Sequence, residues 1–417
     1  MSNKYDKVVK NIDILIHNKK IIEVGKNIKI SGTKVINATN KYVLPGLINC
    51  HTHIPMNVFK EAVDGYSLQD WLTKVIWPIE DKLTNNDMYW FTKLGVMESL
   101  ISGVTTINDM YFKTDQIIKV CNELGINWIT SPTLIETKDK KKDDDKFNQV
   151  RNLVNQYGNK NVSLCIHGLY TCSPNYLTKC VGLAKELNLK LLHIHFCEND
   201  NEVKQIKKIH HVKHPSEVLL RYFKDYKIIL AHCVKLSNTD FKNLKKLDCT
   251  ISYNPITNCK LGCGFANVNK MKQSNIVVGL GTDGDGSGCN QSIMNVARFA
   301  CLLQKGINEN PTSSNAYDVL KMATINGAKA LKIDETKGSI DINKDADLVL
   351  YDLNDIMTNP INDPISDIVY NSSYNNVDTV IVNGKILISN RKPINVDINR
   401  LINKCNKLSI KLKLTNG

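Results

Sequence analysis

The feature that most constrains this chain is a long alternation of apolar, strand-like segments with helix-like segments between residues 42 and 281. The apolar segments are rich in Val, Ile and Leu, which is typical of strands buried on both faces of a parallel sheet. Eight of them occur, at Tyr42–Cys50, Val104–Asp109, Trp128–Leu134, Val162–Gly168, Leu189–His195, Lys227–Cys233, Cys249–Asn254 and Ile276–Gly281. Eight strands separated by helices, such as Asp87–Ser102 and Pro174–Glu186, predict an α/β protein with a (β/α)8 TIM-type barrel.

Short strands flanked by turns are predicted at both ends of the chain. They lie at Ile12–Ile16, Ile21–Val24, Val35–Ala38, Asp347–Tyr351, Val377–Val382 and Lys385–Ile388. The pair Asn383-Gly384 suits a tight hairpin turn between the last two. We therefore expect a small β-sandwich domain formed from both termini, with residues 1–45 and 341–417 as its two parts and the barrel at residues 46–340.

The chain carries a net charge of +13, from 54 Lys and Arg against 41 Asp and Glu. No block of five or six basic residues is interleaved with aromatic residues. We interpret the charge as a solvated basic surface and expect no nucleic-acid partner. A catalytically inactive, nucleic-acid-binding scaffold stays open as the alternative from another functional class.

The 13 cysteines indicate a reducing compartment, because several of them, such as Cys165 and Cys249, fall in buried strands. The first residues lack the apolar region of a signal peptide, and no apolar run approaches the ~18–20 residues of a membrane span. We expect a cytoplasmic homo-oligomer without a membrane partner.

Two polar segments are predicted to lie outside the active site. The mixed-charge run Lys138–Lys146 is expected to form a mobile loop. His210, His211 and His214 lie in a lysine-rich stretch, where neighbouring positive charges disfavour a cation, so we place them at the surface.

Ionisable residues follow five of the eight predicted barrel strands, at the carboxyl ends where barrel enzymes build their active sites. These residues are His51, His53, His167, His193, His195, Glu198, His232 and Asp283. Residues two apart in a strand face the same side, so His51 and His53 point together into the barrel mouth. For His193, two residues before His195, a packed histidine and a contact behind the ligands both stay open.

Neutral imidazoles together with a carboxylate suit Zn²⁺ or Fe²⁺ better than Mg²⁺ or Ca²⁺. The sequence therefore predicts one divalent metal, Zn²⁺ first and Fe²⁺ as the alternative. Its expected ligands are His51, His53, His195 and Asp283.

Longer motifs extend this pattern over nearly the whole chain. They are LPGLINCHTH at 44–53, WPIE at 77–80, GVTTINDMY at 103–111, HGLYTCS at 167–173, HIHFCE at 193–198, AHCV at 231–234, NPITNCKLGCG at 254–264 and GTDG at 281–284. Together they resemble the amidohydrolase superfamily, and in particular its methylthioadenosine/S-adenosylhomocysteine deaminase group, which includes 5′-deoxyadenosine deaminases. The resemblance implies the same fold and the same four metal ligands. It also implies substrate contacts at Glu80, through ribose hydroxyls, and at His167, Glu198 and Asp283.

The resemblance implies hydrolytic deamination of an adenine base to the inosine analogue and ammonia. A bound metal lowers the pKa of water towards ~7. His232 is expected to hydrogen-bond this water, and Asp283 to take its proton. Glu198, three residues after His195, is expected to give a proton to ring nitrogen N1 as hydroxide adds at C6.

The absence of arginines at three positions affects which 5′ group the substrate is expected to carry. Lys60 stands where relatives carry Arg, and Pro132 and Lys146 stand where related deaminases can have Arg near the far end of the substrate. No Arg precedes Arg151, so this part of the chain has no guanidinium group to bind an amino-acid carboxylate through two hydrogen bonds. Lys does not replace Arg in this role. Nucleosides with a neutral 5′ end are therefore favoured over S-adenosylhomocysteine: 5′-deoxyadenosine, methylthioadenosine and adenosine. It stays open whether Lys60 or Lys146 takes the role of the missing Arg.

A guanine, cytosine or triazine aminohydrolase or chlorohydrolase on the same barrel is the alternative within this class of enzymes.

Overall fold

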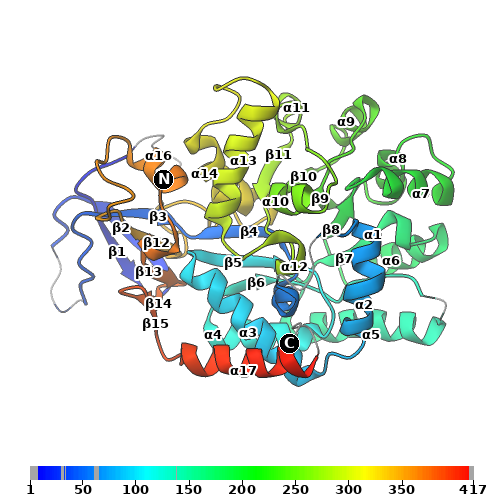
Figure 1. Ribbon diagram of the computed structural model, residues 1–417, viewed down its shortest axis with the longest axis horizontal. Coiled ribbons are helices and arrows are strands. Elements are labelled where there is room, and N and C mark those ends of the chain that lie inside the picture. Colours follow the sequence, from blue (N-terminus) through cyan, green and yellow to red (C-terminus); the bar gives the residue numbers. More distant parts are fainter. Residues whose placement is uncertain (1–7, 30–31, 33, 61–64, 138, 413–417) are drawn as a thin grey trace.

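The barrel consists of eight parallel strands that follow one another in chain order (Figure 1). The computed structural model describes residues 8–29, 32, 34–60, 65–137 and 139–412. The barrel strands are β4 (Leu47–Thr52), β5 (Val104–Asp109), β6 (Asn127–Ile129), β7 (Leu164–Gly168), β8 (Leu191–Phe196), β9 (Lys227–His232), β10 (Cys249–Tyr253) and β11 (Val277–Leu280). They form two parallel sheets, β4-β5-β6 and β7-β8-β9-β10-β11.

Isolated parallel bridges join these two sheets into a ring. Thr130 pairs with Val162 and Leu134 with Ile166, which connects the continuation of β6 to β7. At the other seam Thr52 pairs with Asp283, beyond the ends of β4 and β11. The predicted (β/α)8 barrel is therefore confirmed.

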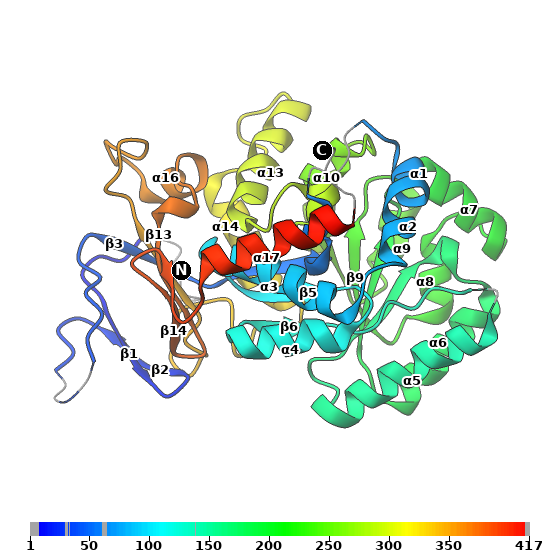
Figure 2. The same ribbon diagram turned by 60° about the horizontal axis from the view of Figure 1, so that its bottom comes forward.

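Helices cover the outside of the ring, as Figures 1 and 2 show from two directions. The longer ones are α3 (Asn85–Ile101), α4 (Thr114–Leu124), α5 (Lys140–Tyr157), α6 (Pro174–Glu186), α7 (Asp200–His210), α8 (Ser216–Tyr222), α9 (Asn238–Leu244), α13 (Ile293–Ile307) and α14 (Ala316–Ala323). Their starts follow ordinary capping rules: Ser173, for example, accepts a hydrogen bond from the Tyr176 amide, and Pro174 opens α6. None of the helices in the described part of the chain is long and apolar enough to cross a membrane.

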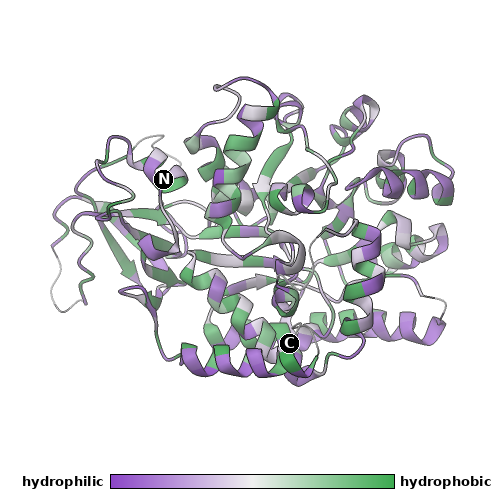
Figure 3. Ribbon diagram, viewed as in Figure 1, coloured by the Kyte–Doolittle hydropathy of each residue, from purple (hydrophilic) through white to green (hydrophobic). Residues whose placement is uncertain are grey.

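Short helical segments complete the barrel and its loops. They are η1 (Ile54–Phe59), α1 (Leu68–Asp70), η2 (Trp71–Ile76), α2 (Trp77–Glu80), η3 (Leu169–Thr171), α10 (Pro255–Lys260), α11 (Val268–Gln273), α12 (Asp285–Gly288) and α15 (Ile325–Ala330). Hydrophobic residues gather on the strands and on the helix faces beside them, as the green colour in Figure 3 shows.

The two ends of the chain meet in a second β structure beside the barrel. Its main sheet has the order β15-β14-β13-β12-β3, from β3 (Lys41–Pro45), β12 (Leu348–Asp352), β13 (Val377–Val382), β14 (Lys385–Ser389) and β15 (Lys392–Pro393). A two-stranded ribbon of β1 (Asp13–His17) and β2 (Lys20–Gly25) packs on it through a shared apolar cluster that includes Ile21, Leu348 and Ile381. Asn383 and Gly384 form the predicted turn between β13 and β14, both with positive φ.

Three expected elements differ from the structure. The predicted strand Tyr42–Cys50 is two strands, β3 and β4, broken at Gly46, where a side chain would collide with Thr105. The predicted strand Val35–Ala38 is not a strand: it pairs with no strand among the residues that the structure describes, and Val35 is exposed. The predicted loop Lys138–Lys146 is wrong from Lys140 onward: Asp139 caps α5 by accepting from two backbone amides, while Lys138 lies outside the described residues.

The remaining helical segments, α16 (Pro364–Tyr370), η4 (Tyr374–Asn376) and α17 (Ile398–Lys411), belong to the C-terminal part. The last of them, α17, leaves the sheet and packs along α3 of the barrel (Figure 2).

Candidate active site and metal centre

Side chains from four barrel strands converge at the carboxyl ends of the strands. Ligand-capable atoms of His51, His195, His232 and Asp283 all lie within 4.8 Å of one another, and all four residues are buried. His53 joins them, because its Nε2 lies 3.1 Å from Asp283 Oδ1 and 3.2 Å from His195 Nε2. The structure thus brings together the four residues expected to bind a metal, with His232 beside them.

The hydrogen bonds of His53 and His195 leave two bare nitrogens facing each other. His53 Nδ1 donates to the Met110 carbonyl, and His195 Nδ1 donates to the His167 carbonyl, each over 2.5 Å. In a neutral imidazole the other nitrogen then carries a lone pair. Two such lone pairs at 3.2 Å repel each other unless a cation lies between them. This donor set therefore fits a divalent metal.

His51 differs from the other two expected ligands in its partner. Its Nδ1 lies 2.8 Å from His193 Nε2, and its Nε2 lies 3.1 Å from Asp283 Oδ1. Binding of a cation at His51 Nε2 requires the proton shared with His193 to reside on His51 Nδ1. His193 is fully buried directly behind His51.

Asp283 divides its two oxygens between the histidines and two hydroxyl groups. Oδ1 lies beside His51 and His53, while Oδ2 accepts hydrogen bonds of 2.8 Å from Thr257 and from Ser287. Burial alone would raise the pKa of Asp283, but its close contacts with His51 and His53 prevail and hold this pKa well below its ordinary value. The carboxylate is therefore ionised at neutral pH.

His232 is oriented as a donor. Its Nδ1 accepts from the Asn258 amide over 2.9 Å, so the proton of the neutral ring lies on Nε2. Burial lowers the pKa of His232 to about 3, which keeps the ring neutral. A ring that offers N–H towards the cluster suits a hydrogen bond to a water better than ligation of a cation.

Glu198 lies two residues beyond β8 and is 8% exposed. Its Oε1 lies 3.7 Å from His232 Nδ1 and 3.8 Å from the Cys263 thiol. Burial raises the pKa of Glu198 well above its ordinary value, and the charges of Asp283 and Glu202 raise it further. The pKa of Asp283 is thus lowered and that of Glu198 raised at one site, which is the division that acid–base chemistry requires.

Glu80, at the end of α2, accepts a hydrogen bond from the phenol of Tyr111, which follows β5. Burial raises the pKa of Glu80 to about 7, although the bond from Tyr111 lowers it. The His167 ring is 5.1 Å from that of His195, and burial lowers the pKa of His167 to about 4. Both expected substrate contacts thus lie close to the histidine cluster, since Tyr111 also neighbours His53 with ring centroids 6.0 Å apart.

The two candidate lysines occupy different surroundings. Lys60 is engaged by acids, with Nζ 2.8 Å from Glu98 and 3.2 Å from the fully buried Asp285. Lys146 donates to the Ile135 carbonyl over 3.1 Å, and burial lowers its pKa. Lys60 is therefore engaged in ion pairs with two acidic side chains.

Several residues with contacts in the site were not singled out by the sequence: Tyr111, Glu202, Thr257, Cys263 and Ser287. Tyr111 had a usable signal, because it directly follows a barrel strand at the carboxyl end. The expectation of a surface position was wrong for His210, which is buried and donates to the Leu169 carbonyl.

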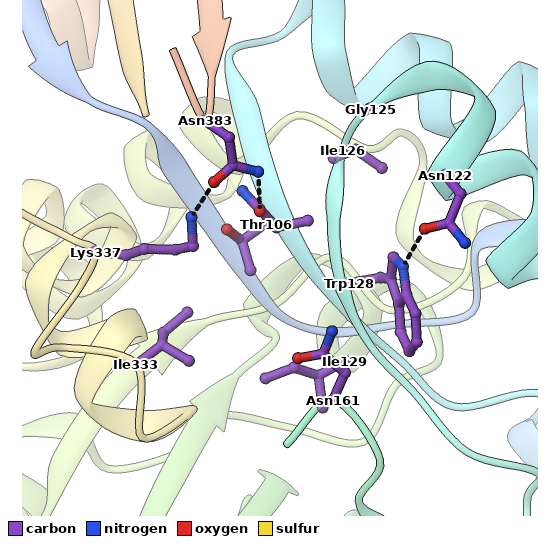
Figure 4. A pocket seen from close by; sticks show the side chains of 11 residues that line it. Thr106, Asn122, Gly125, Ile126, Trp128, Ile129, Asn161, Ile333, Lys337 and Asn383 are labelled. Atoms are coloured by element: carbon purple, nitrogen blue, oxygen red, sulfur yellow. Dashed lines mark hydrogen bonds between the residues drawn. The ribbon is translucent and has the colours of Figure 1, made fainter. Parts of the chain in front are cut away.

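A polar hollow of about 290 Å³ lies at the opposite end of the barrel, between the starts of the strands and the terminal sheet (Figure 4). Lys337 in its wall is paired with Asp347 at 2.7 Å and with Asp345 at 3.2 Å, and it also binds the Asn383 side chain. These groups satisfy one another, so we assign no chemistry to this hollow.

The fold and the cluster together define a barrel hydrolase whose metal centre lies at the carboxyl ends of the strands. A model of the amidohydrolase family matches residues 42–387, and the chain belongs to this family. It is a metal-dependent aminohydrolase.

Curated relatives and solved structures extend this similarity over almost the whole chain. The chain is 37% identical over 414 residues to the 5-methylthioadenosine/S-adenosylhomocysteine deaminase of Caldanaerobacter subterraneus subsp. tengcongensis, covering 96% of this chain and 94% of that protein. It is 36% identical over 412 residues to the 5′-deoxyadenosine deaminase of Methanocaldococcus jannaschii, covering 96% of each. A zinc-bound adenosine deaminase from Xanthomonas campestris has the same fold, with a TM-score of 0.92 at 24% identity over 98% of this chain and 95% of that one.

Proposed function

We propose that this enzyme hydrolytically deaminates the adenine base of adenosine-type nucleosides, releasing ammonia and the inosine analogue. The observation that carries this proposal is the position of the buried Glu198, whose pKa is raised, beside a cluster of histidines and Asp283 that could hold a metal. The relatives named as nucleoside deaminases, at 36–37% identity, support it.

The side chains divide the reaction between them. Glu198 donates its proton to ring nitrogen N1, which makes C6 electrophilic. His232 holds the attacking water through Nε2–H, and Asp283 accepts the proton that this water loses as its oxygen adds to C6. Asp283 then passes this proton to the exocyclic amino group, the C6–N bond breaks and ammonia leaves. The remaining proton on the C6 oxygen returns to Glu198. Glu80 accepts hydrogen bonds from ribose hydroxyls, and His167 contacts the bound nucleoside.

His51, His53, His195 and Asp283 would hold the metal, and we propose Zn²⁺ because three imidazoles and one carboxylate are common ligands of catalytic zinc. When bound, the cation supplies a water of lowered pKa, towards ~7. Metal analysis of the purified protein, with reconstitution of the metal-free protein by Zn²⁺ or Fe²⁺ in turn, tests this assignment. Full activity with Fe²⁺ and none with Zn²⁺ would replace zinc by iron.

For the 5′ end of the substrate we propose a neutral group, as in 5′-deoxyadenosine, methylthioadenosine or adenosine. Lys60 is already paired with Glu98 and Asp285, which supports this choice. Lys146 retains a positive charge near His167, so weaker turnover of S-adenosylhomocysteine is expected rather than none.

The deciding experiment follows the change in absorbance from adenine to hypoxanthine with the metal-loaded enzyme. The panel comprises 5′-deoxyadenosine, methylthioadenosine, adenosine and S-adenosylhomocysteine, with guanine, cytosine and a chlorotriazine as the alternative substrates of this class. We expect the highest kcat/KM for a nucleoside with a neutral 5′ end. Turnover confined to free bases or triazines would contradict the proposal.

We further propose that the enzyme acts in the cytoplasm as a homo-oligomer. The thirteen free cysteines, most of them buried, support a reducing compartment. Light scattering during size-exclusion chromatography measures the oligomeric state directly.

A further inference from the structure

A second buried glutamate, Glu202 of α7, lies directly behind the proposed acid. Its Oε1 accepts the backbone N–H of Cys197 over 2.9 Å, and its Oε2 accepts that of Glu198 over 2.6 Å. Glu202 is 4% exposed, so the carboxylate is held largely away from water. Its own backbone N–H is fixed by the cap residue Asn199 over 2.9 Å.

The segment held by Glu202 has an unusual backbone. Cys197 has a φ of 52°, a left-handed conformation that non-glycine residues rarely adopt. The chain turns here from the end of β8, which carries His195, to the side chain of Glu198. A clamp on two consecutive N–H groups fixes this turn, and with it the direction in which Glu198 points.

The chemistry of the clamp requires a carboxylate. Each carboxylate oxygen accepts one N–H here, whereas the amide of glutamine offers one acceptor and one donor. Burial raises the pKa of Glu202 to about 7, while the bonds from the Glu198, Cys197 and Asn199 amides lower it. A buried carboxylate is costly, so its position beside Glu198 calls for a function.

We infer that Glu202 is the positioning residue of the acid: its carboxylate holds the turn that aims Glu198 at the substrate ring. This inference rests on the proposed function, in which Glu198 is the proton donor.

Other groups also act on Glu198, and they must stay constant in any test. They are Asp283 after β11, His232 at the end of β9, Cys263 after α10 and Tyr170 in η3. Two acidic side chains, Asp283 and Glu202, act on Glu198. Asp283 is an expected metal ligand, so only Glu202 can be substituted without changing the expected ligand set.

The test compares Glu202→Gln and Glu202→Asp with a matched variant, Asp240→Asn. Asp240 of α9 is a buried carboxylate of the same kind, because it accepts the backbone N–H groups of Ser216 and Ser237 over 3.1 Å and 3.0 Å. Ser216 and Ser237 lie at the starts of two outer helices, α8 and α9, so Asp240→Asn loosens a comparable clamp outside the site.

We expect Glu202→Gln to keep its metal and its KM but to lose about tenfold to a hundredfold in kcat, as a misdirected catalytic group does. Loss of the neighbouring charge also lowers the pKa of Glu198, so the alkaline limb of the kcat profile moves to lower pH. Glu202→Asp keeps the charge but withdraws the carboxylate by one methylene group. It should therefore lose kcat while its alkaline limb stays in place, and Asp240→Asn should retain both properties of the parent enzyme.

Parental kcat and an unmoved alkaline limb in Glu202→Gln would overturn the inference, as would equal losses of kcat in Glu202→Gln and Asp240→Asn. If Glu202→Gln does not fold, the kcat of Glu202→Asp decides, and parental kcat in that variant overturns the inference. Glu198→Gln, assayed in parallel, separates the two proposals. Full activity in Glu198→Gln refutes the role of the acid itself, whereas an inactive Glu198→Gln beside a fully active Glu202→Gln refutes only the role of Glu202.

Discussion

The phenol of Tyr111 donates a hydrogen bond to the carboxylate of Glu80 and so connects the end of β5 to α2. Thr133 holds the Tyr111 carbonyl from the neighbouring strand region, through its amide at 3.0 Å and its hydroxyl at 3.2 Å. The proposed ribose-binding carboxylate is therefore supported by the barrel itself, although it lies on a segment outside the strands.

This pair predicts pH-dependent substrate binding. Burial raises the pKa of Glu80 to about 7, and ionised Glu80 is the better acceptor for ribose hydroxyls. As pH falls through 7, Glu80 becomes protonated, so KM for the nucleoside should rise several-fold between pH 8 and pH 6. Tyr111→Phe removes the donor that lowers this pKa, so the rise should begin at higher pH. KM measured in Glu80→Gln should lack this dependence, and an unchanged profile in Tyr111→Phe would count against the coupling.

Glu198→Gln should reduce kcat by roughly 10²–10⁴, the usual contribution of a positioned acid or base. Its metal content should equal that of the parent enzyme, because Glu198 is not among the expected ligands. Steady-state kinetics and elemental analysis of the same preparation measure both quantities. The exposed Glu309→Gln serves as the control and should keep full turnover. Turnover near the parental rate in Glu198→Gln would remove Glu198 from the mechanism.

The double variant His51→Ala, His53→Ala should purify with little bound metal, because it removes two of the three expected imidazole ligands and ends their contacts with Asp283. Elemental analysis gives the occupancy directly. His211→Ala, a change at an exposed histidine, should keep the parental metal content. Full occupancy in the double variant would refute the ligand assignment.

Lys60→Met should destabilise the fold without changing the preference for the 5′ group. The change leaves the buried Asp285 without its cation, although Asn57 and Gln291 still donate to it. The Lys60 side chain is 37% exposed, so solvent screening reduces the effect, and we expect a loss of about 1–3 kcal/mol in the free energy of unfolding. Urea denaturation measures this loss. A selective loss of activity on S-adenosylhomocysteine would instead make Lys60 a substrate contact.

The barrel and the residues at its strand ends were predictable because they rest on local patterns. Strands buried on both faces read as apolar runs, and the ring places the carboxyl end of each run at one face. The two-residue spacing of His51 and His53 then directs both side chains to the same side. The position of Tyr111 just after β5 is a weaker signal of the same kind, because its contact with Glu80 lies on another segment. No such pattern indicates Glu202, which acts through backbone N–H groups of a turn.

Failures of the strand and loop predictions have a similar origin. Val35–Ala38 has the composition of a strand, but a strand also needs a partner, which composition does not reveal. The charged start of α5 resembles a loop, yet the cap at Asp139 and the apolar residues Phe147, Val150 and Leu153 beyond it form a helix. The division of Tyr42–Cys50 depends on the close approach of Thr105 to Gly46, which only the assembled fold shows.

The barrel closes where the amide of Asp283 donates to the carbonyl of His51 over 3.1 Å. Two of the proposed ligands, His51 and Asp283, lie 232 positions apart in the sequence and meet at this seam. A cation bound by both residues would link the first strand to the last and so stabilise the closed ring. During synthesis this link cannot form until the eighth strand has emerged and docked. An unfinished barrel therefore lacks a complete proposed metal centre, and it also lacks the proposed acid–base pair, which depends on Asp283.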